Sequence, residues 1–234
     1  MGARPERVAD DVWIVRGGFR MSMSVFLIKG PDGVTVFDAG IRSMAGAIRE
    51  AAAALGQIKR VILGHAHPDH RGAAPYLAAP VLCHPEEKAD AQSEAGEHYF
   101  DLSKLDVPFR FVMPVLLRRW DGGPVNVAGT VEEGDTVAGF EVLHLPGHAP
   151  GQIALWRDRD RLILTSDLFY TLDPQTGRRT PPLLPHRAFN LDGEQARASI
   201  LRVAEMKPSA AWPGHADPVV GDVAEELRRA ADST

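Results

Sequence analysis

The sequence has few of the residues from which disulfide-bonded, secreted or membrane-spanning proteins are built. It contains one cysteine, Cys83, so no disulfide can form within the chain and no paired-cysteine motif is present. The surrounding segment, PVLCHPE, is typical of a buried strand end, which predicts an inert thiol. The N-terminal stretch MGARPERVADDVW lacks the apolar core of a secretory signal, and no apolar run approaches the ~20 residues of a membrane span. These absences predict a cytoplasmic protein.

An excess of positive charge is also missing. The 26 basic and 31 acidic residues give a formal net charge of −5, whereas phosphate contacts require a basic surface. The pairs Arg118–Arg119 and Arg178–Arg179 are too short to form a basic patch. Walker A, GxGxxG and GxSxG motifs are absent as well. We therefore expect a small-molecule substrate and neither a nucleic acid nor a membrane as partner, with the oligomeric state open and a homodimer as one option.

The first half of the chain has the pattern of a hairpin, a helix and a strand. Two apolar segments, Val25–Ile28 and Val34–Phe37, flank the turn sequence KGPDG. Apolar residues at helical spacing then run from a cap at Ser43 to a stop at Gly56. The β-branched segment Arg60–Leu63 predicts a further short strand. This order of elements indicates α/β layering.

The second half repeats this order. The segment IALWRDRDRLILTSD predicts a hairpin with its turn at Arg157–Asp160. Asp192 is the expected N-cap of the following helix, with Gln195 completing a capping box. Asp38 and Asp167 follow equivalent strands, and each half ends in Gly-His. The two halves are therefore predicted to be structural repeats of one hairpin–helix–strand unit.

The segment 96–130 interrupts this repeat with a mixture of aromatic, proline and leucine residues. We expect residues 1–234 to form a single domain in which 96–130 is an insertion that covers the substrate. A helix pair that only shields the core would have the same composition.

Four potential metal ligands occur within six positions of the stretch VILGHAHPDHRG. If the preceding strand continued through His65 and His67, both side chains would point to one face. Pro68 would then end the ladder and bring Asp69 and His70 to a second position nearby. Packing requires none of these polar groups at a strand end, so the cluster predicts a metal site.

Further candidate ligands lie in similar settings. His148 and His215 each follow Pro-Gly, which allows the backbone to approach a site closely. Asp167 ends a largely apolar strand, where an unpaired carboxylate would be costly and a cation is its natural partner. Four other histidines lack such settings: His84, His98, His144 and His186. The simplest interpretation of His144 is a strand position, and we expect His98 and His186 to face substrate or solvent.

The pattern His-x-His-x-Asp-His, followed by Pro-Gly-His, Ser-Asp and Gly-His, resembles that of the metallo-β-lactamase superfamily of metal-dependent hydrolases. The resemblance extends from FLIKGPDGVTVFDAG to PGHAD and implies a four-layer αββα sandwich with a two-metal site on one edge. It also implies an outer-sphere role for Asp38 behind a histidine, although a strand-end cap is an alternative. The implied ligands are His65, His67 and His148 for the first metal, Asp69, His70 and His215 for the second, and Asp167 as a bridge between both.

Five imidazoles and two carboxylates without a thiolate suit Zn²⁺ best, with Fe and Mn also acceptable. Two such ions would share a water, and metal binding lowers the pKa of water from 15.7 to about 7. The resulting hydroxide would attack a carbonyl or phosphoryl centre. Asp69 would transfer the proton as a general acid–base.

The family comparison favours a lactone or another carboxylic ester as substrate. Members that open β-lactams generally lack an acid at the position of Asp167 and are exported, so we expect at most a weak β-lactamase side activity. Thioesterases resembling glyoxalase II carry a C-terminal glutathione-binding region, and few residues follow His215 here. A thioesterase without that region and a mononuclear-iron sulfur dioxygenase remain alternatives.

One further residue has a candidate catalytic role. Tyr170 lies three residues after Asp167, as in quorum-quenching lactonases, where a phenol could hydrogen-bond the substrate carbonyl. Alternatively, Tyr170 packs beside Phe169. The acyl pocket departs from many lactonases, because Arg71 and Ala73-Ala74 stand where they have small glycines.

Overall fold

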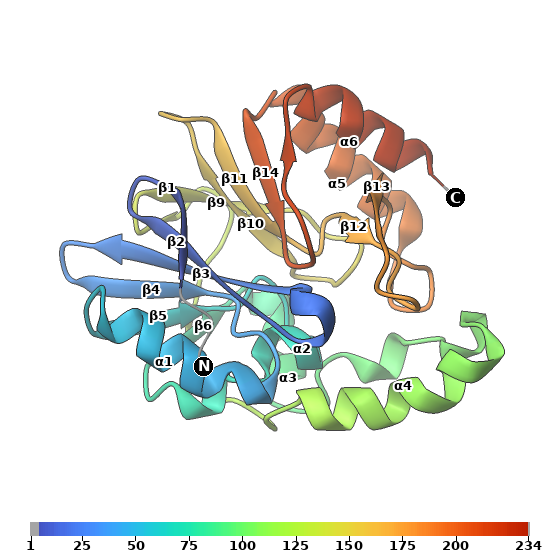
Figure 1. Ribbon diagram of the computed structural model, residues 1–234, viewed down its shortest axis with the longest axis horizontal. Coiled ribbons are helices and arrows are strands. Elements are labelled where there is room, and N and C mark those ends of the chain that lie inside the picture. The colour runs from blue at the N-terminus through green and yellow to red at the C-terminus, as the bar shows by residue number, and fades with distance from the viewer. Residues whose placement is uncertain (1–4, 234) are drawn as a thin grey trace.

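Two β-sheets packed face to face form the centre of the molecule in the computed structural model, which describes residues 5–233 (Figure 1). Residues 1–4, which belong to the stretch without a signal-like apolar core, and Thr234 lie outside the described residues. The first sheet contains seven strands in chain order: β1 (Glu6–Ala9), β2 (Val12–Gly17), β3 (Met23–Gly30), β4 (Gly33–Phe37), β5 (Ile58–Ile62), β6 (Val81–Cys83) and β7 (Val127–Thr130). The second contains, from edge to edge, β15 (Val219–Val220), β14 (Ala210–Pro213), β11 (Leu162–Ser166), β10 (Ile153–Arg157), β9 (Phe140–His144) and β8 (Thr136–Val137).

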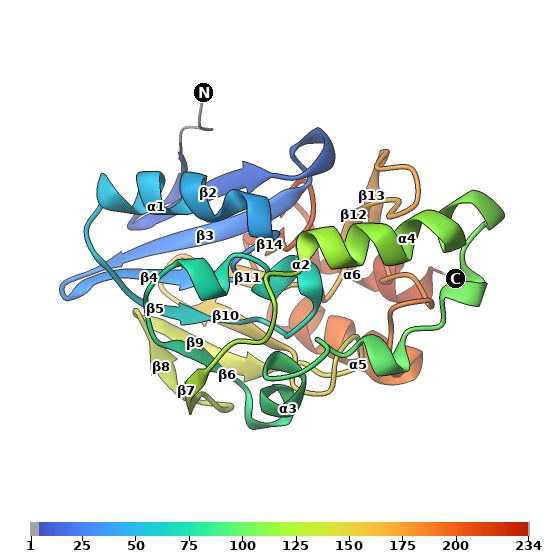
Figure 2. The same ribbon diagram turned by 90° about the horizontal axis from the view of Figure 1, so that it is seen from below.

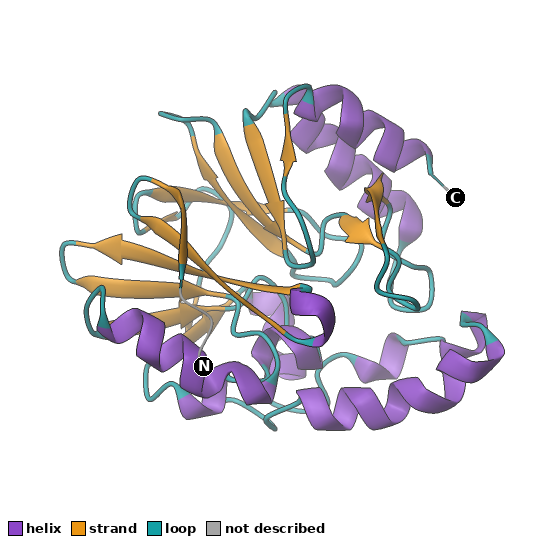
Figure 3. Ribbon diagram, viewed as in Figure 1, coloured by secondary structure: helices purple, strands orange, loops and turns teal. Residues whose placement is uncertain are grey.

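Helices cover the outer faces of both sheets (Figure 3). The first sheet is covered by α1 (Ala45–Ala53), α2 (Pro68–Arg71), α3 (Lys88–Ala91) and α4 (Val107–Trp120), and the second by α5 (Gly193–Glu205) and α6 (Val223–Asp232). A small ribbon of β12 (Tyr170–Leu172) and β13 (Arg179–Leu183) stands beside them. Between residues 5 and 233, no helix combines the length and the apolar character needed to cross a membrane. The order helix, sheet, sheet, helix confirms the predicted four-layer αββα sandwich.

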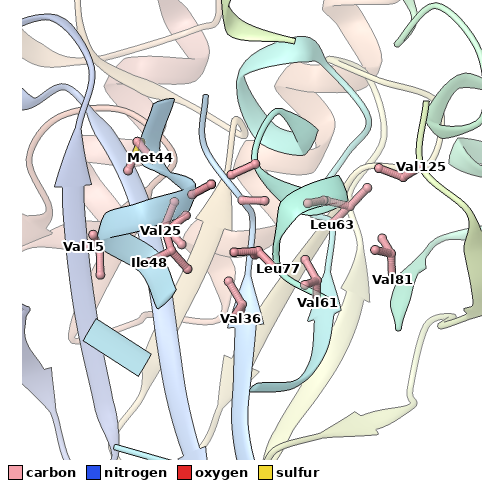
Figure 4. Packing of buried hydrophobic residues seen from close by; sticks show 14 of the residues in the cluster. Val15, Val25, Val36, Met44, Ile48, Val61, Leu63, Leu77, Val81 and Val125 are labelled. Atoms are coloured by element: carbon pink, nitrogen blue, oxygen red, sulfur yellow. The ribbon is translucent and has the colours of Figure 1, made fainter. Parts of the chain in front are cut away.

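The alternation of side chains along β3 explains how one strand serves two cores. Val25 and Leu27 point outward and join the cluster under α1, where Val25 lies close to Ile48 (Figure 4). Phe26 and Ile28 point to the opposite face and pack against the second sheet. Successive strand residues face opposite sides, so a strand covered on both faces must be apolar throughout. Each fully buried side chain of this kind stabilises the fold by ~1.5–3 kcal/mol.

The two halves of the chain repeat one unit, as predicted. In the first half, β3 pairs antiparallel with β4, and β4 pairs parallel with β5 after α1. In the second half, β10 pairs antiparallel with β11, and β11 pairs parallel with β14 after α5. The β10–β11 turn covers residues 158–161, one position later than expected. Both parallel pairs therefore place their carboxyl ends at equivalent edges.

Two details of helix capping differ from the prediction. Ser43 does not cap α1, because it lies within a 3₁₀ turn (Arg42–Met44) that runs directly into the helix. Asp192 does cap α5, and its carboxylate accepts hydrogen bonds from the N–H groups of Glu194 and Gln195. The reciprocal half of the capping box is not formed, because the N–H of Asp192 donates to the carbonyl of Gly147 instead. The start of α5 is thereby tied to the loop that carries His148.

The segment 96–130 consists of two 3₁₀ turns, the helix α4 and a final strand. Its last residues, 127–130, form β7 and pair with β6, so they belong to the first sheet rather than to a covering insertion. The helix α4 runs past α2 at the side of the molecule (Figure 2). Its buried face, with Met113 and Leu117, packs against Ala188 and Phe189 from the second half of the chain. One helix, rather than a pair, thus bridges the two halves.

Candidate metal centre

The predicted ligands follow the carboxyl ends of the paired parallel strands. The strand β5 ends at Ile62, so His65 and His67 lie in a loop, and the expectation that a continued strand orients them is wrong. Pro68 occupies the first turn of α2, where its missing N–H is not needed, and begins the helix that carries Asp69 and His70. The loops after β4, β5, β9, β11 and β14 meet at this edge of the sandwich, and there the structure brings all seven predicted side chains together.

The first cluster consists of three buried histidines, His65, His67 and His148, whose nitrogens lie close enough to bind one ion. Nε2 of His148 lies 3.1 Å from Nδ1 of His67. The ring of His65 lies 4.4 Å from that of His67 and 5.0 Å from that of His148. Within the part of the chain that the structure describes, Nε2 of His65 is buried without a hydrogen-bond partner. An acceptor nitrogen left in this way suits a metal.

The second cluster consists of Asp69, His70 and His215. Nε2 of His215 lies 3.4 Å from Nε2 of His70 and 3.4 Å from Oδ2 of Asp69. Asp167 lies between the clusters, with Oδ2 3.1 Å from His215 and 3.6 Å from His148. Its Oδ1 is 3.2 Å from Nε2 of His70 but, among the described residues, has no hydrogen bond. The carboxylate of Asp167 therefore reaches both clusters.

Four of the five histidines are held at the ring nitrogen that faces away from the clusters. The partners and distances are Ser166 Oγ at 3.1 Å for His65, Tyr99 Oη at 2.6 Å for His67, Asp38 Oδ2 at 3.0 Å for His70, and Asn190 Oδ1 at 2.8 Å for His148. Such outer contacts fix the tautomer and orientation of a ligating imidazole and are typical of metal sites. The other ring nitrogen of each of these histidines faces the clusters, in position to bind an ion.

Asp38 has both of the roles considered for it. Besides contacting His70, its carboxylate accepts hydrogen bonds from the N–H of Gly64 at 2.7 Å and the hydroxyl of Ser166 at 2.8 Å. It thus caps the end of β5 and supports a histidine. Gly64 permits this arrangement, because a Cβ there would collide with Ser166 and lie 2.9 Å from Oδ1 of Asp38.

Close backbone approach also explains the Pro-Gly-His motifs. A Cβ on Gly214 would collide with the carboxylate of Asp167 and the ring of His70. Gly147 has a φ of 130°, and a Cβ there would overlap the backbone of Ala196 in α5. Both positions therefore require glycine.

The protonation states agree with a site that binds cations. Burial lowers the pKa of His65 and His67 well below the usual value, and neighbouring histidines lower it further. Burial lowers the pKa of His215 as well, but the carboxylates of Asp167 and Asp69 together outweigh burial and raise this pKa to about 9. For Asp167, the charges of His215 and His70 overcome the effect of burial and hold the pKa far below its usual value. Protons thus balance the buried carboxylates in the metal-free protein, and metal ions would replace them.

A cavity of about 360 Å³ opens onto the clusters. His67, Asp69, Asp167 and His215 line its floor. Its wall is mostly apolar, with Ser22 and Gln175 as neutral polar members. The apolar residues come mainly from α4 and the nearby loops: Phe19, Phe100, Phe109, Val112, Met113, Leu116, Leu117, Trp120, Leu172 and Phe189. Among the described residues, no lysine or arginine lines it. Any substrate must therefore reach the clusters across an apolar, uncharged surface.

Tyr170 lies in this cavity wall rather than only packing beside Phe169. Its ring is 5.2 Å from that of His215, and 4% of the residue is exposed. Burial raises the pKa of its phenol well above the usual value, and the carboxylates of Asp167 and Asp69 raise it further. The phenol therefore keeps its proton at neutral pH and can donate a hydrogen bond.

Sequence reasoning missed Tyr99 and Asn190, because each becomes a histidine partner only through the fold. The other histidines lie outside the cavity lining. The side chain of His98 is 55% exposed and faces Asp90 and Glu94. His84 and His144, which the sequence left in separate settings, stack with ring centroids 4.0 Å apart and form a further acid–imidazole group with Glu86.

Comparison with known families agrees with this geometry. The family model described as "Metallo-beta-lactamase superfamily" matches residues 18–215. The chain belongs to this superfamily. The match spans the two half-repeats and every side chain of the two clusters, and it makes the protein a member of a metallo-hydrolase family.

Individual relatives in the superfamily are distant. The chain is 29% identical over 211 residues to the probable metallo-hydrolase YflN of Bacillus subtilis, covering 82% of this chain and 78% of that protein. It is 27% identical over 207 residues to the probable metallo-hydrolase YybB of the same organism, covering 86% and 84%. Among solved structures, a metallo-beta-lactamase family protein from Thermus thermophilus superposes with a TM-score of 0.67 at 23% identity, covering 97% of this chain and 78% of that one. The metallo-beta-lactamase FIM-1 from Pseudomonas aeruginosa gives 0.69 at 13% identity, covering 99% and 96%. These structures establish the shared fold.

Proposed function

We propose that the protein is a binuclear metal-dependent hydrolase of uncharged carboxylic esters, with lactones as the favoured substrates. The observation that carries the proposal is the convergence of seven buried or cavity-lining donors, two of which, Nε2 of His65 and Oδ1 of Asp167, lack a hydrogen bond within residues 5–233. The first ion would be held by His65, His67 and His148, the second by Asp69, His70 and His215, and both by Asp167. Zn²⁺ suits this imidazole-rich set best, with Fe and Mn as alternatives.

The bound ions would supply an activated water at neutral pH and polarise the substrate oxygen. Asp69 is the chain's candidate general acid–base, because its carboxylate lines the cavity floor and is ordered by His215 at 3.4 Å. It would take the proton released on attack and deliver it to the leaving oxygen. Tyr170 would donate its phenolic proton as a hydrogen bond to the carbonyl oxygen as negative charge develops there.

The cavity supports an uncharged substrate. A β-lactam carboxylate, a phosphodiester or a glutathione conjugate would have to place an additional anion against apolar side chains. No lining lysine or arginine is available among the described residues to pair with it. An apolar acyl or alkyl group would instead fit against α4. An uncharged thioester remains the second candidate, since it differs only in the leaving atom.

The presence of both clusters also favours hydrolysis over sulfur dioxygenation. A mononuclear iron centre would use two histidines and one aspartate, and the second set of buried ligands would then have no function. We further propose a small-molecule substrate without a nucleic-acid or membrane partner, and a cytoplasmic location.

The test combines metal analysis with a substrate panel. Zn-, Mn- and Fe-loaded protein would be assayed on neutral lactones, esters and thioesters, and on anionic β-lactams and phosphodiesters. We expect two metal ions per chain and turnover of neutral esters or lactones at least about tenfold above every anionic substrate. Absence of bound metal, or a preference for the anionic substrates, would contradict the proposal.

A further inference from the structure

A fully buried acid connects the two loops that carry the first cluster. Glu87 lies at the end of a 3₁₀ turn (Pro85–Glu87), directly before α3, and its side chain has no exposed surface. Its Oε2 accepts a hydrogen bond from the N–H of Ala66 at 2.7 Å, and its Oε1 accepts one from the N–H of Gly151 at 2.7 Å. Ala66 lies between two of the predicted ligands, and Gly151 lies three residues after the third.

Among the described residues, the carboxylate makes only these two hydrogen bonds and takes part in no ion pair. A buried carboxylate without a counter-charge is costly, so a fold keeps one only where it satisfies groups that nothing else reaches. Here those groups are two buried backbone amides, Ala66 and Gly151, on segments that are remote in sequence. Glu87 thereby sets the spacing between them.

Gly151 is fitted to this contact. A Cβ at this position would lie 2.9 Å from Cγ and 3.0 Å from the backbone nitrogen of Glu87, and 2.8 Å from Nδ1 of His84. Real Cβ contacts are essentially never shorter than 3.0 Å, so any other residue would push the loop away from the acid. The connection between the two loops therefore depends on an acidic side chain at position 87 and on glycine at position 151.

We propose that Glu87 is a positioning residue for the first metal ion. It holds the 65–67 loop and the 148–151 loop at the separation that lets His65, His67 and His148 bind one ion. The second cluster has independent support, because Asp38 contacts His70 at 3.0 Å and the carbonyl of Gly214 accepts a hydrogen bond from the N–H of Ser24. Loss of Glu87 therefore weakens the first site selectively. This inference rests on the metal assignment proposed above.

The test is metal titration of the E87Q variant, in which size is kept but one acceptor oxygen becomes an amide that faces an N–H group. E94Q is the matched control, since Glu94 lies in the same segment with its side chain 61% exposed. Zn²⁺ would be titrated into metal-free protein by calorimetry, and the thermal midpoint of each variant would be measured with and without Zn²⁺. We expect wild type and E94Q to bind two ions, and E87Q to bind one normally and the other about 10- to 100-fold more weakly.

G151A is a second route to the same effect, because its Cβ would push the loop away from Glu87 while the carboxylate itself is kept. We expect the same selective loss, together with a smaller Zn²⁺-induced rise in thermal midpoint. Two wild-type affinities in both E87Q and G151A would overturn the inference while leaving the proposed function intact. If both variants lost Zn²⁺ affinity equally at the two sites, and the thermal midpoint of each metal-free variant fell by the same amount, Glu87 would have a general structural role. That result would also overturn the inference. No metal binding by the wild type would instead refute the proposed function itself.

Discussion

Replacing Tyr99 with phenylalanine removes one oxygen from the back of the metal centre. In the structure, the hydroxyl of Tyr99 lies 2.6 Å from Nε2 of His67, while Nδ1 of the same ring faces the first cluster. The phenylalanine ring would keep the packing of Tyr99 against His67 and Phe100, both with centroids 5.6 Å away. The substitution therefore tests the hydrogen bond alone.

The size of the expected loss of Zn²⁺ affinity follows from Nε2 of His67, the buried nitrogen that loses its hydrogen-bond partner. An unsatisfied buried donor costs ~1–3 kcal/mol. Since 1.4 kcal/mol corresponds to a tenfold change in an equilibrium constant, Zn²⁺ at the first cluster should bind about 5- to 150-fold more weakly. Competition against a chromophoric chelator measures this affinity directly. Tyr76→Phe is the control, because that hydroxyl makes one weak contact, 3.4 Å from the carbonyl of Gly122, away from the clusters. Unchanged affinity in Tyr99→Phe would refute the view that the 96–130 segment orients a ligand.

Three further predictions test the site. Asp167→Ala should reduce bound Zn²⁺ from two ions per chain to one or none and abolish hydrolysis, whereas His144→Ala should leave metal content and hydrolysis near normal. Plasma mass spectrometry measures the metal content and an ester assay the hydrolysis. Full activity of a metal-depleted Asp167→Ala protein would contradict the prediction. Tyr170→Phe should lower kcat about 100-fold with little change in KM or metal content, because it removes one hydrogen-bond donor to the developing oxyanion. An unchanged kcat on acyl lactones would exclude Tyr170 as that donor. Val112 lies in the cavity wall, and Val112→Lys should raise KM for apolar esters about tenfold. Phe111 is 73% exposed on the same helix but outside the lining, so Phe111→Lys should leave KM unchanged. Equal KM values for the two variants would show that α4 does not contact substrate.

The α/β layering and a candidate metal cluster could be predicted from local patterns, whereas the four-layer sandwich and the assignment of ligands to two ions came from the resemblance to the superfamily. A hairpin turn such as KGPDG and the alternation of β3 act over a few residues, and the second half repeats them with different side chains. His65, His67, Asp69 and His70 are close in sequence, so their spacing alone indicated a shared site. In the other half, the Pro-Gly settings of His148 and His215 and the strand-end position of Asp167 indicated further candidates.

The outer contacts could not be predicted, because each joins segments that are far apart in the sequence. Asn190 is 42 residues from His148, and Tyr99 is 32 residues from His67. Ser43 shows the same limit on a smaller scale. Its residue type favours an N-cap, but the chain enters α1 through a 3₁₀ turn that already satisfies the N–H of Met44 with the carbonyl of Ile41. Tertiary context decided these positions, and composition carried no signal for them.

The repeated halves and the segment 96–130 contribute differently to the site: the halves carry the predicted metal ligands, and the segment forms a wall of the cavity. The repeated strands place the predicted metal ligands in the loops after their carboxyl ends. The segment 96–130 provides both the α4 wall of the cavity and Tyr99 behind His67. A change in this segment would therefore alter the substrate and the affinity of the first ion together. Grafting a different segment onto the same halves should change substrate preference while the second cluster, supported by Asp38, keeps its metal.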